Sequence, residues 1–455
     1  MDTKIKLPSD YINKMKNLLG DEFDDYMDSF NSPASKAVHL NTNLLSNESF
    51  QKMFTEEFEM INGTGNCYKS LISNIGYHPL FHSGLIYSQD PSAMMPIEAL
   101  PNILPKGALA LDLCAAPGGK TSQLAIKLNE INGYLLSNEP NVSRNKILKS
   151  NIERMGFNNV SVSCAKPDEI AALLPGAFSL IVIDAPCSGE GMFRKYPDAP
   201  NEWSVQNVKM CSERQKEIIN SIMPALRDGG YILYSTCTYS REEDEEIIEY
   251  MTENHNLSYI EPTDYVKKNS ICRESQKGFV LYPHKFYGEG QFLCLLKKNG
   301  SLTEGTQTFV NSYKKISRDK YKLFEEIFTN GNLPENIKDC LYEVNNKIIY
   351  VPNSALPFAS KIMSSYGFIM GEADRNRLIP HHQLFKILGS YLENEIELSN
   401  DTAGVNDYLK GLELSNNNAK NGYGIIKYNN AVLGGFKCSG GRLKNHYPKG
   451  LRNLH

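Results

Sequence analysis

The middle third of this 455-residue chain alternates short apolar runs with helical stretches, and this alternation constrains the fold more than any other feature. The apolar runs predict strands over 108–113, 134–137, 160–163, 179–183 and 231–235, and the helical stretches start at residue 121 and cover 143–155 and 213–227. Glycines mark two expected helix ends, Gly156 and the pair Gly229-Gly230. Strands that alternate with helices form a doubly wound, mainly parallel sheet. The sequence therefore predicts an α/β fold with a Rossmann-like domain over residues 91–298.

The regions on either side of this domain have different patterns. Residues 1–90 mix helical patterns with short strands, which predicts an N-terminal α+β subdomain. Residues 299–395 start in the polar sequence KKNGSLTEGTQ and then read as helical, which predicts a linker and a helical connecting segment. Residues 396–455 are rich in glycine and asparagine and predict a small β module.

The overall charge gives no sign of nucleic-acid binding. Lys and Arg number 48 against 52 Asp and Glu, a formal net charge of -4, so any phosphate-binding surface must be a local patch. The first residues lack the apolar region of a signal peptide, and no run of about 18 apolar residues predicts a membrane span. The ten cysteines are scattered, and neither CxxC nor HExxH occurs. We therefore expect a cytoplasmic protein with no disulfide scaffold and no metal site.

The segment from Asp112 to Lys120, DLCAAPGGK, follows the first predicted strand and carries the first chemical signal. Small residues and glycines let the backbone approach a ligand closely, and the helix that follows offers its N-terminal amides. Glu139 comes 21 residues after Gly118, where adenosine-binding α/β folds place a carboxylate for the ribose hydroxyls. The phosphate-loop pattern GxxxxGK[ST] is absent. The sequence predicts a nucleoside cofactor without a pyrophosphate.

Two cysteines follow the ends of two other predicted strands. Cys187 lies in DAPCSGEG, directly after Asp184, and Cys237 lies in YSTCTY. Open α/β sheets bind substrates just beyond the carboxyl ends of their strands. Two thiols delivered there, next to a carboxylate, predict covalent chemistry, whereas a lone buried cysteine is usually inert packing.

Several segments of the chain resemble the motifs of the RNA cytosine-C5 methyltransferases, the family that includes the Nop2/Sun proteins. The segments are LDLCAAPGGKTSQLA, NEPNVSRNKIL, IDAPCSGEGMFRK, YSTCTYSREEDEEI and YPHKFYGEGQF, with VHLNT and YSQDPSAM upstream. KNHYPKGLR, residues 444–452, resembles the end of the bacterial 16S ribosomal RNA methyltransferase F type. The resemblance covers nearly the whole chain, and over 108–245 four motifs occur in the expected order.

The resemblance implies S-adenosylmethionine as the cofactor and a role for each site residue. Cys237 is implied as the nucleophile that adds to C6 of the cytosine, Cys187 as the residue that assists release, and Asp184 as a contact of the N3 edge that also borders the cofactor. The methionine part of the cofactor is implied to lie against Cys114, Ala115, Ala116, Pro117, Gly118, Gly119 and Lys120, and its ribose against Glu139. Lys120 also suits a salt bridge with a nearby carboxylate.

The resemblance to the F type also implies a PUA-like RNA-binding module at the C-terminus and RNA contacts in residues 1–90. Five Lys and Arg and no Asp or Glu occur between Lys437 and His455, with Tyr447 among them. The residues expected to bind RNA phosphates are Arg442, Lys444, Lys449 and Arg452, together with Arg194 and Lys195 after the first cysteine. The acidic run 242–246 reads as the solvated start of a helix, where negative charge is favourable.

Two departures from the family pattern concern binding residues. Cys164, Lys166 and Asp168 stand where the family often has an Asp near the adenine, and they leave that contact unassigned. His39 stands where an Arg is common, which puts an RNA contact there in doubt.

Three alternatives to a ribosomal RNA methyltransferase stay open. A transfer RNA substrate is hard to separate by sequence from ribosomal RNA or the 30S subunit. A DNA cytosine methyltransferase typically uses the Cys of a Pro-Cys motif and needs no second one, so Cys237 favours RNA. A non-catalytic RNA-binding assembly protein would not need Cys187, Asp184 and the glycine loop intact. We expect the protein to act as a monomer.

Overall fold

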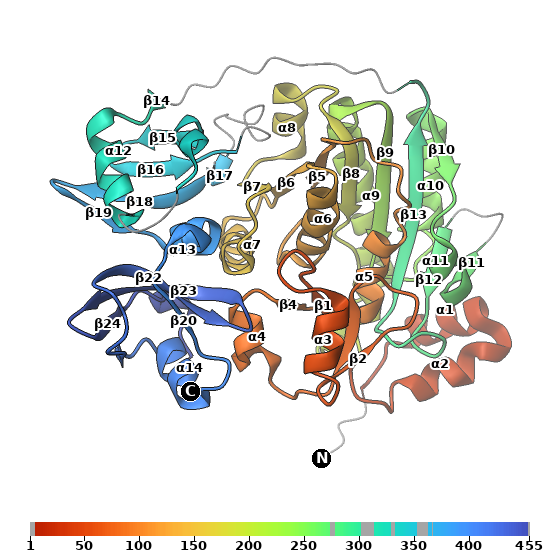
Figure 1. Cartoon of the computed structure of the whole chain (residues 1–455). Helices are drawn as coiled ribbons and strands as arrows, with labels where there is room; N and C mark the ends of the chain where they lie inside the picture. The colour runs from red at the N-terminus through yellow and green to blue at the C-terminus, as the bar shows by residue number, and fades with distance from the viewer. Residues whose placement is uncertain are drawn as a thin grey trace.

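The structure, a computed structural model, describes residues 5–273, 278–301, 314–328, 333–352, 363–365 and 367–453. Most of the polar linker predicted after residue 299 lies outside these residues. The described strands form four sheets, and the sheets occupy successive parts of the chain apart from the short strand β17 (Figure 1). Among the described residues, no helix combines the length and the apolar character that crossing a membrane requires.

The largest sheet has ten strands in the order β11-β12-β13-β9-β8-β5-β6-β7-β17, with β10 paired to β13. Its strands are β5 Leu109–Asp112, β6 Tyr134–Asn138, β7 Val160–Ser163, β8 Phe178–Asp184, β9 Leu226–Thr236, β10 Leu257–Ile260, β11 Ile271–Arg273, β12 Gly278–Leu281, β13 Gln291–Lys298 and β17 Met363–Ser365. Strands β5 to β9 pair in parallel, whereas β13 runs antiparallel to β9. In the sheet, β6 and β7 follow β5 on one side, whereas β8 and β9 follow it on the other side. The sheet therefore has its switch point between β5 and β8, and the predicted Rossmann-like fold is confirmed.

Helices cover both faces of this sheet. They are α6 Gly119–Glu130, α7 Val142–Met155, α8 Pro167–Leu173, α9 Val205–Ile222, α10 Glu245–Asn254 and α11 Asp264–Asn269. Leu128 of α6 and Ile152 of α7 pack on one face, and Ile170 of α8 and Ile219 of α9 pack on the other. Gly156 ends α7 with φ 72°, the left-handed conformation expected of a helix cap.

The predicted boundary before β9 is wrong. Helix α9 occupies residues 205–222 instead of 213–227, and it ends just before Pro224, which lacks the N–H that a continuing helix needs. Gly229 and Gly230 stop no helix. They lie inside β9, where Gly229 has φ 72° and the register against β8 shifts. The two glycines therefore mark an irregularity of the strand.

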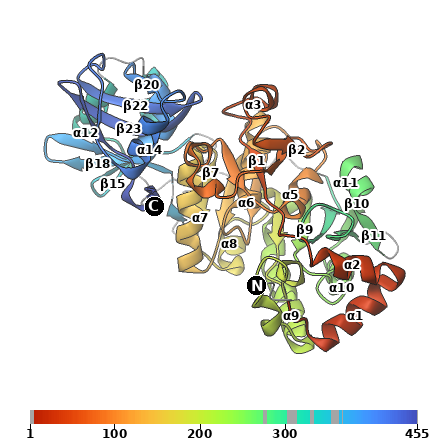
Figure 2. The same cartoon turned by 90° about the horizontal axis from the view of Figure 1, so that it is seen from below.

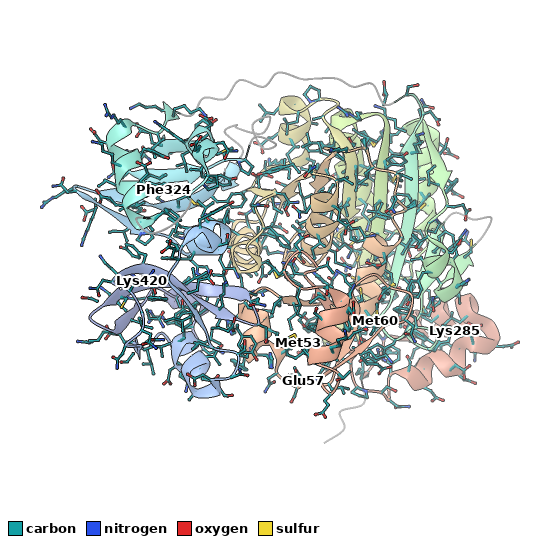
Figure 3. All side chains as sticks on the ribbon, in the orientation of Figure 1. Met53, Glu57, Met60, Lys285, Phe324 and Lys420 are labelled. Atoms are coloured by element: carbon teal, nitrogen blue, oxygen red, sulfur yellow. The ribbon has the colours of Figure 1, made fainter. Side chains whose placement is uncertain are left out.

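Two N-terminal helices, α1 Ser9–Leu19 and α2 Phe23–Ser29, pack against the large sheet at the end opposite the C-terminal module (Figure 2). Tyr11 and Tyr26 belong to the same apolar layer as α9 and α10, and their hydroxyl oxygens lie 2.5 Å apart. Lys285, labelled beside these helices in Figure 3, reaches Glu22 at 2.9 Å. The helices thus join the core of the Rossmann-like domain.

The rest of the N-terminal region forms an antiparallel sheet in the order β2-β3-β1-β4. Its elements are β1 Ala37–Leu40, α3 Asn47–Met53, β2 Phe58–Met60, β3 Cys67–Ser70, α4 Pro79–His82, β4 Ile86–Ser88 and α5 Pro91–Glu98. The edge strand β4 lies beside the loop after β5, because the Tyr87 hydroxyl donates to Pro117 O at 3.1 Å. A second hydrogen bond joins the same sheet to the large domain: His39 Nε2 of β1 lies 2.9 Å from Ser122 Oγ of α6.

The helical connecting segment predicted for 315–395 is wrong. Residues 314–380 hold an antiparallel sheet in the order β14-β15-β16-β18-β19, with helix α12 between β14 and β15 and helix α13 after β19. The elements are β14 Lys314–Lys315, α12 Arg318–Glu325, β15 Leu341–Val344, β16 Lys347–Tyr350, β18 Phe368–Asp374, β19 Arg377–Pro380 and α13 His382–Leu388. The residues Asn345 and Asn346 between β15 and β16 are the sequence feature that could have indicated a hairpin. Asn345 has φ 54°, a conformation that asparagine adopts more readily than most residues. Phe324 of α12, labelled in Figure 3, is fully buried in the core of this unit.

The C-terminal sheet has the order β20-β22-β23-β24-β21 and confirms the predicted β module. Its elements are β20 Glu395–Glu397, α14 Thr402–Lys410, β21 Leu414–Ser415, β22 Gly422–Tyr428, β23 Ala431–Ser439 and β24 Arg442–Asn445. Ile425 of β22 packs with Leu384 and Phe385 of α13, so the two last sheets share one core across residue 396. We call residues 314–453 the C-terminal module.

The C-terminal module is attached to the N-terminal region through polar contacts. His82 of α4 bonds the Tyr447 hydroxyl at 2.7 Å and Asn453 Oδ1 at 3.0 Å. Lys386 of α13 donates to Ser83 O and to Val432 O, both at 2.5 Å. Buried polar groups that bond across a junction help to fix the relative position of its two sides.

Candidate active site

The loop after β5 and the start of α6 lie at the switch point of the sheet. Backbone bonds hold the loop from both sides: Leu113 N donates to Val182 O of β8, and Ala115 N donates to Asn138 O of β6, each at 2.9 Å. Gly118 has φ 115°, which only glycine adopts without strain, and it turns the chain into α6. The first amides of α6 therefore point to the carboxyl edge of the sheet, as the sequence predicted for a cofactor loop.

Asp112, the last residue of β5, is a buried structural carboxyl beneath this loop. Its Oδ2 accepts the Thr121 hydroxyl at 2.6 Å, and Thr121 Oγ1 lies 2.7 Å from Ser137 Oγ. Burial, opposed by the Thr121 hydrogen bond, raises the pKa of Asp112 to about 7. The carboxyl thus ties β5 to α6 and to β6 below the loop.

Glu139 follows the last residue of β6 and is 3% exposed. Its Oε1 accepts the backbone N–H of Asn141 at 2.9 Å, and its Oε2 lies 3.4 Å from Arg144. Arg144 also donates to Ala116 O at 2.8 Å, so one guanidinium spans the carboxylate and the glycine loop. Arg144 lies in the segment NEPNVSRNKIL, and it is a site residue that the sequence prediction did not include.

Lys120 and Asp184 form an ion pair across the switch point, with Nζ and Oδ2 2.9 Å apart. Asp184 Oδ1 accepts Ser235 Oγ at 2.7 Å and Gln291 Nε2 at 3.3 Å. The Lys120 side chain is 7% exposed, whereas Asp184 is 34% exposed and keeps one side open. The salt bridge suggested for Lys120 is therefore present, and Gln291 at the start of β13 is a partner that the sequence analysis missed.

Cys187 and Cys237 meet because β8 and β9 are parallel neighbours and each cysteine follows its strand. Their sulfur atoms lie 3.3 Å apart. The hydrogen bond with Cys237, together with burial, raises the pKa of the Cys187 thiol well above its usual range. The two thiols, Asp184 and the cofactor loop therefore share one edge of the sheet.

The acidic run 242–246 leads into helix α10, Glu245–Asn254, as predicted, but the prediction that the run is solvated is wrong for Glu243. Glu243 is 0% exposed, and its Oε2 accepts the Ser188 N–H at 2.9 Å and Gln215 Nε2 at 3.0 Å. Burial raises the pKa of Glu243 to about 7, although both hydrogen bonds favour the charged form. No local sequence pattern indicates this burial, because the partners of Glu243 lie 55 and 28 residues away.

Glu190, in the loop after Cys187, is a second buried carboxylate that the sequence analysis missed. It has a full set of partners: Lys14 at 2.5 Å, Trp203 Nε1 and Ser240 Oγ at 2.8 Å, and the Tyr239 N–H at 2.9 Å. Because a cation and several donors satisfy it, Glu190 fastens α1 to both cysteine loops as a structural anchor.

Arg194 does not face an RNA phosphate, and we withdraw that prediction. Its guanidinium pairs with Glu289 at 2.7 Å and donates to Gly288 O and Ser29 O, and the side chain is 11% exposed. All its donors are thus directed at protein groups. Lys195 is exposed instead, beside the ring of Tyr196, which is 54% exposed.

The predicted RNA-binding residues of the C-terminal module differ in their availability. Lys444, Lys449 and Arg442 are exposed, with Arg442 2.7 Å from Glu413 at the surface, whereas Arg452 is half-buried, 3.4 Å from Tyr447 O. Tyr447 is 2% exposed and therefore packs in the module instead of facing solvent.

The two departures from the family pattern have simple structural explanations. His39 is fully buried, and burial lowers its pKa to about 3, so the imidazole stays neutral and packs against Tyr87. Cys164 after β7 directs its sulfur to Pro140 O at 3.5 Å, whereas Lys166 and Asp168 are exposed at the start of α8. Of the three, only Cys164 points back toward the loop that follows β6.

The site fits an adenosine cofactor. Gly118 and Gly119 leave the backbone bare at the amino end of α6, and a Cβ on Gly119 would lie 2.7 Å from the Gln89 side chain. The buried carboxylate of Glu139 stands at the end of the neighbouring strand, as ribose hydroxyls require. Among the described residues, His, Cys, Asp and Glu side chains form no group of three that suits a metal ion.

Comparison with known proteins agrees with this geometry. Residues 104–297 match the family described as 16S rRNA methyltransferase RsmB/F, residues 7–91 the N-terminal domain of 16S rRNA methyltransferase RsmF, and residues 393–453 the methyltransferase RsmF PUA domain. The chain is 28% identical to proteins named ribosomal RNA small subunit methyltransferase F from Psychromonas ingrahamii and Vibrio vulnificus. Each match spans 99% of this chain and 98% of the relative.

Solved structures show the same fold. A methyltransferase homolog from Pyrococcus horikoshii matches with a TM-score of 0.56 and 24% identity over 65% of this chain and 96% of that one. NSun6 from Pyrococcus horikoshii, solved with SFG, matches with a TM-score of 0.54 and 19% identity over 65% of this chain and 99% of that one. The cofactor is S-adenosylmethionine. Three family matches in the expected order, on a sheet with its glycine loop and paired cysteines in place, show that the chain belongs to the Nop2/Sun family of methyltransferases and to its methyltransferase F subgroup.

Proposed function

We propose that this chain methylates C5 of a cytosine in small-subunit ribosomal RNA, with Cys237 as the covalent nucleophile. The observation that carries the proposal is the 3.3 Å approach of the Cys187 and Cys237 sulfur atoms beside the Asp184–Lys120 pair. A cytosine ring that reaches this edge meets a nucleophile, a carboxylate and the cofactor loop together. The residues proposed to hold the cofactor are Cys114 to Lys120 and Glu139, with Arg144 bracing the loop through Ala116 O.

The bound cofactor supplies an electrophilic methyl group. The Cys237 thiolate forms a C–S bond to C6 of the cytosine, and the displaced electron pair makes C5 nucleophilic enough to take that methyl. Asp184, which is 34% exposed, faces the N3 edge as the ring gains electron density. A base then takes the proton from C5, the C–H electron pair restores the C5–C6 double bond, and the C–S bond breaks with its electron pair on the Cys237 sulfur. We assign assistance in this last step to Cys187.

The choice of RNA follows from the relatives and from the C-terminal module. The relatives are named for small-subunit ribosomal RNA, and residues 393–453 match a PUA domain, so we propose ribosomal RNA or the 30S subunit as the partner. A cytosine reaches a pocket at the edge of an α/β sheet only when it is extruded from its helix. Exposed Lys195, Lys444 and Lys449 are proposed to bind the neighbouring phosphates.

The chemistry is tested with Cys237→Ala and Cys187→Ala on unmethylated ribosomal RNA and cofactor. Cys237→Ala should abolish methyl transfer while cofactor affinity stays nearly unchanged. Cys187→Ala should leave protein covalently attached to RNA on a denaturing gel, and the adduct should vanish in the double variant. Substantial methylation by Cys237→Ala would refute the nucleophile assignment.

The substrate is tested by bisulfite mapping in a strain that lacks the gene. A signal lost from 16S ribosomal RNA and restored with the gene supports the proposal. A loss confined to transfer RNA would keep the chemistry and remove the ribosomal assignment. A strain with every 5-methylcytosine retained would favour a non-catalytic assembly factor instead.

A further inference from the structure

Glu243 connects the backbone on both sides of Cys187 to the loop that follows Cys237. Its Oε2 accepts the N–H of Ser188, directly after Cys187, at 2.9 Å. The same oxygen accepts Gln215 Nε2 at 3.0 Å, and that nitrogen also donates to Pro186 O at 3.1 Å. One carboxylate oxygen therefore restrains residues 186–188 at both ends, from a position six residues beyond the nucleophile.

Two further bonds join the same pair of loops. Ser188 Oγ lies 2.9 Å from Thr238 Oγ1, and Gly191 N donates to Cys237 O at 2.8 Å. These bonds fix the loops to one another near their middle, whereas Glu243 fixes the peptide groups that carry the Cys187 side chain. Both sets of contacts join the two loops whose sulfur atoms lie 3.3 Å apart.

The electrostatics of Glu243 distinguish it from an ordinary scaffold carboxylate. Glu190, the other buried glutamate of these loops, is neutralised by Lys14, whereas Glu243 makes no ion pair within the described part of the chain. Its Oε1 is buried and has no hydrogen-bond partner among those residues. Burying a carboxyl group with neutral donors alone is costly, so the hydrogen bonds that Oε2 accepts from Ser188 and Gln215 hold the group in place without a cation.

We propose that Glu243 is a positioning residue that holds Cys187 against Cys237 for the release of methylated RNA. The inference rests on the release role proposed above for Cys187. The charge of Glu243 adds to the hydrogen bond with Cys237 and to burial in raising the Cys187 pKa, which keeps Cys187 a thiol beside the reacting sulfur. Displacement of a catalytic group by about 1 Å costs on the order of 100-fold in rate, so loss of the restraint should be visible in kinetics.

The test compares Glu243→Ala, Glu243→Gln and Glu246→Gln in the full-length protein with ribosomal RNA and cofactor. Glu243→Ala should methylate RNA in a first turnover, release it about 10- to 100-fold more slowly, and accumulate the Cys237–RNA adduct on a denaturing gel. Glu243→Gln keeps an acceptor oxygen for Ser188 and should restore release to within a few-fold of the unmodified protein. Glu246 is exposed in the first turn of α10, three residues after Glu243, and its Gln variant should behave like the unmodified protein.

The outcomes separate this inference from the proposed function. If Cys187→Ala traps the adduct but Glu243→Ala, with normal cofactor affinity, releases RNA at the unmodified rate, Glu243 has no positioning role. If Cys187→Ala traps nothing, the release role of Cys187 itself fails. Should Glu243→Ala fail to fold, as its melting temperature would show, Gln215→Met removes the link to Pro186 and decides the matter. Slow release then supports the inference, and unmodified release overturns it.

Discussion

Two lysines on the C-terminal module face each other across neighbouring strands. Lys437 of β23 pairs in register with Lys444 of β24 on one side and with Tyr423 of β22 on the other. Lys437 Nζ lies 5.0 Å from the centre of the Tyr423 ring, and both lysines are exposed. Burial, followed by the charges of Lys444 and Lys437, lowers the pKa of nearby His446 to about 4. This row of side chains concentrates positive charge beside an aromatic ring, as single-stranded RNA prefers.

Replacement of both lysines by Gln should weaken RNA binding and leave the fold as stable or slightly more stable. Like charges directly opposite in a sheet destabilise it by roughly 0.2–1 kcal/mol, and the substitution relieves this repulsion. Each lost phosphate contact lowers the slope of log affinity against log salt by about 0.7 for single strands, so two contacts lower it by about 1.4. Over a fourfold rise in salt, from about 50 to about 200 mM, the unmodified protein should then lose about sevenfold more affinity than the variant.

The assay is RNA binding over a salt series together with thermal unfolding of the same preparations. Lys420→Gln is the matched control, because Lys420 pairs with Glu393 at 3.3 Å on the same module (Figure 3). Its salt slope should equal that of the unmodified protein. An unchanged slope in the Lys437/Lys444 variant would refute the phosphate contacts. A fall in melting temperature that parallels the fall in affinity would show that the lysines act through stability.

Two further predictions concern the active site and the junction with the C-terminal module. Lys120→Met leaves Asp184 without its cation and should abolish methylation. Because Asp184 is about a third exposed, we expect the free energy of unfolding, measured in urea, to fall by about 2 kcal/mol. An unchanged urea midpoint would contradict the role of the pair. Burial and the charge of Arg154 lower the pKa of His82 to about 4, so the unfolded chain takes up this proton first as pH falls below about 6.5. At pH 5 this proton uptake lowers the free energy of unfolding by about 2 kcal/mol. His82→Gln should reduce the number of protons bound on unfolding by about one. If the free energy of unfolding changes with pH equally in both proteins, His82 is not the cause of the acid sensitivity.

The parts that the sequence predicts correctly follow from topology. Once β5, β8 and β9 are taken as parallel strands of one sheet, their carboxyl ends must meet, and with them Asp112, Asp184, Cys187 and Cys237. No side-chain detail is needed for that step. Local patterns in the sequence therefore predict the cofactor loop and the paired thiols.

The parts that the sequence does not predict depend on distant partners. In the sequence Arg194 resembles a free cation, because its partner Glu289 lies 95 residues further along the chain, in the loop after β12. Glu243 likewise resembles a solvated carboxylate, because its partners Ser188 and Gln215 are distant in sequence. Charged residues have no periodicity that announces burial, so only the folded geometry separates a paired cation from a phosphate ligand. The sheet of 314–380 has a different cause: four of its five strands are at most four residues long, too short for a clear alternating pattern, and helix α12 lies between β14 and β15.

The junction between α4 and the C-terminal module bears on how RNA binding is best dissected. Removing the residues after 400 would strip His82 of Tyr447 and Asn453, and would leave Leu384 and Phe385 without Ile425. The strand after α4 is β4, whose Tyr87 hydroxyl holds the cofactor loop at Pro117 O. A truncation would therefore disturb the support of the cofactor loop as well as the RNA surface, and weaker cofactor binding in such a protein would not contradict an RNA-binding role. Substitution of Lys437 and Lys444 avoids this, because both side chains are exposed on strands that stay in place.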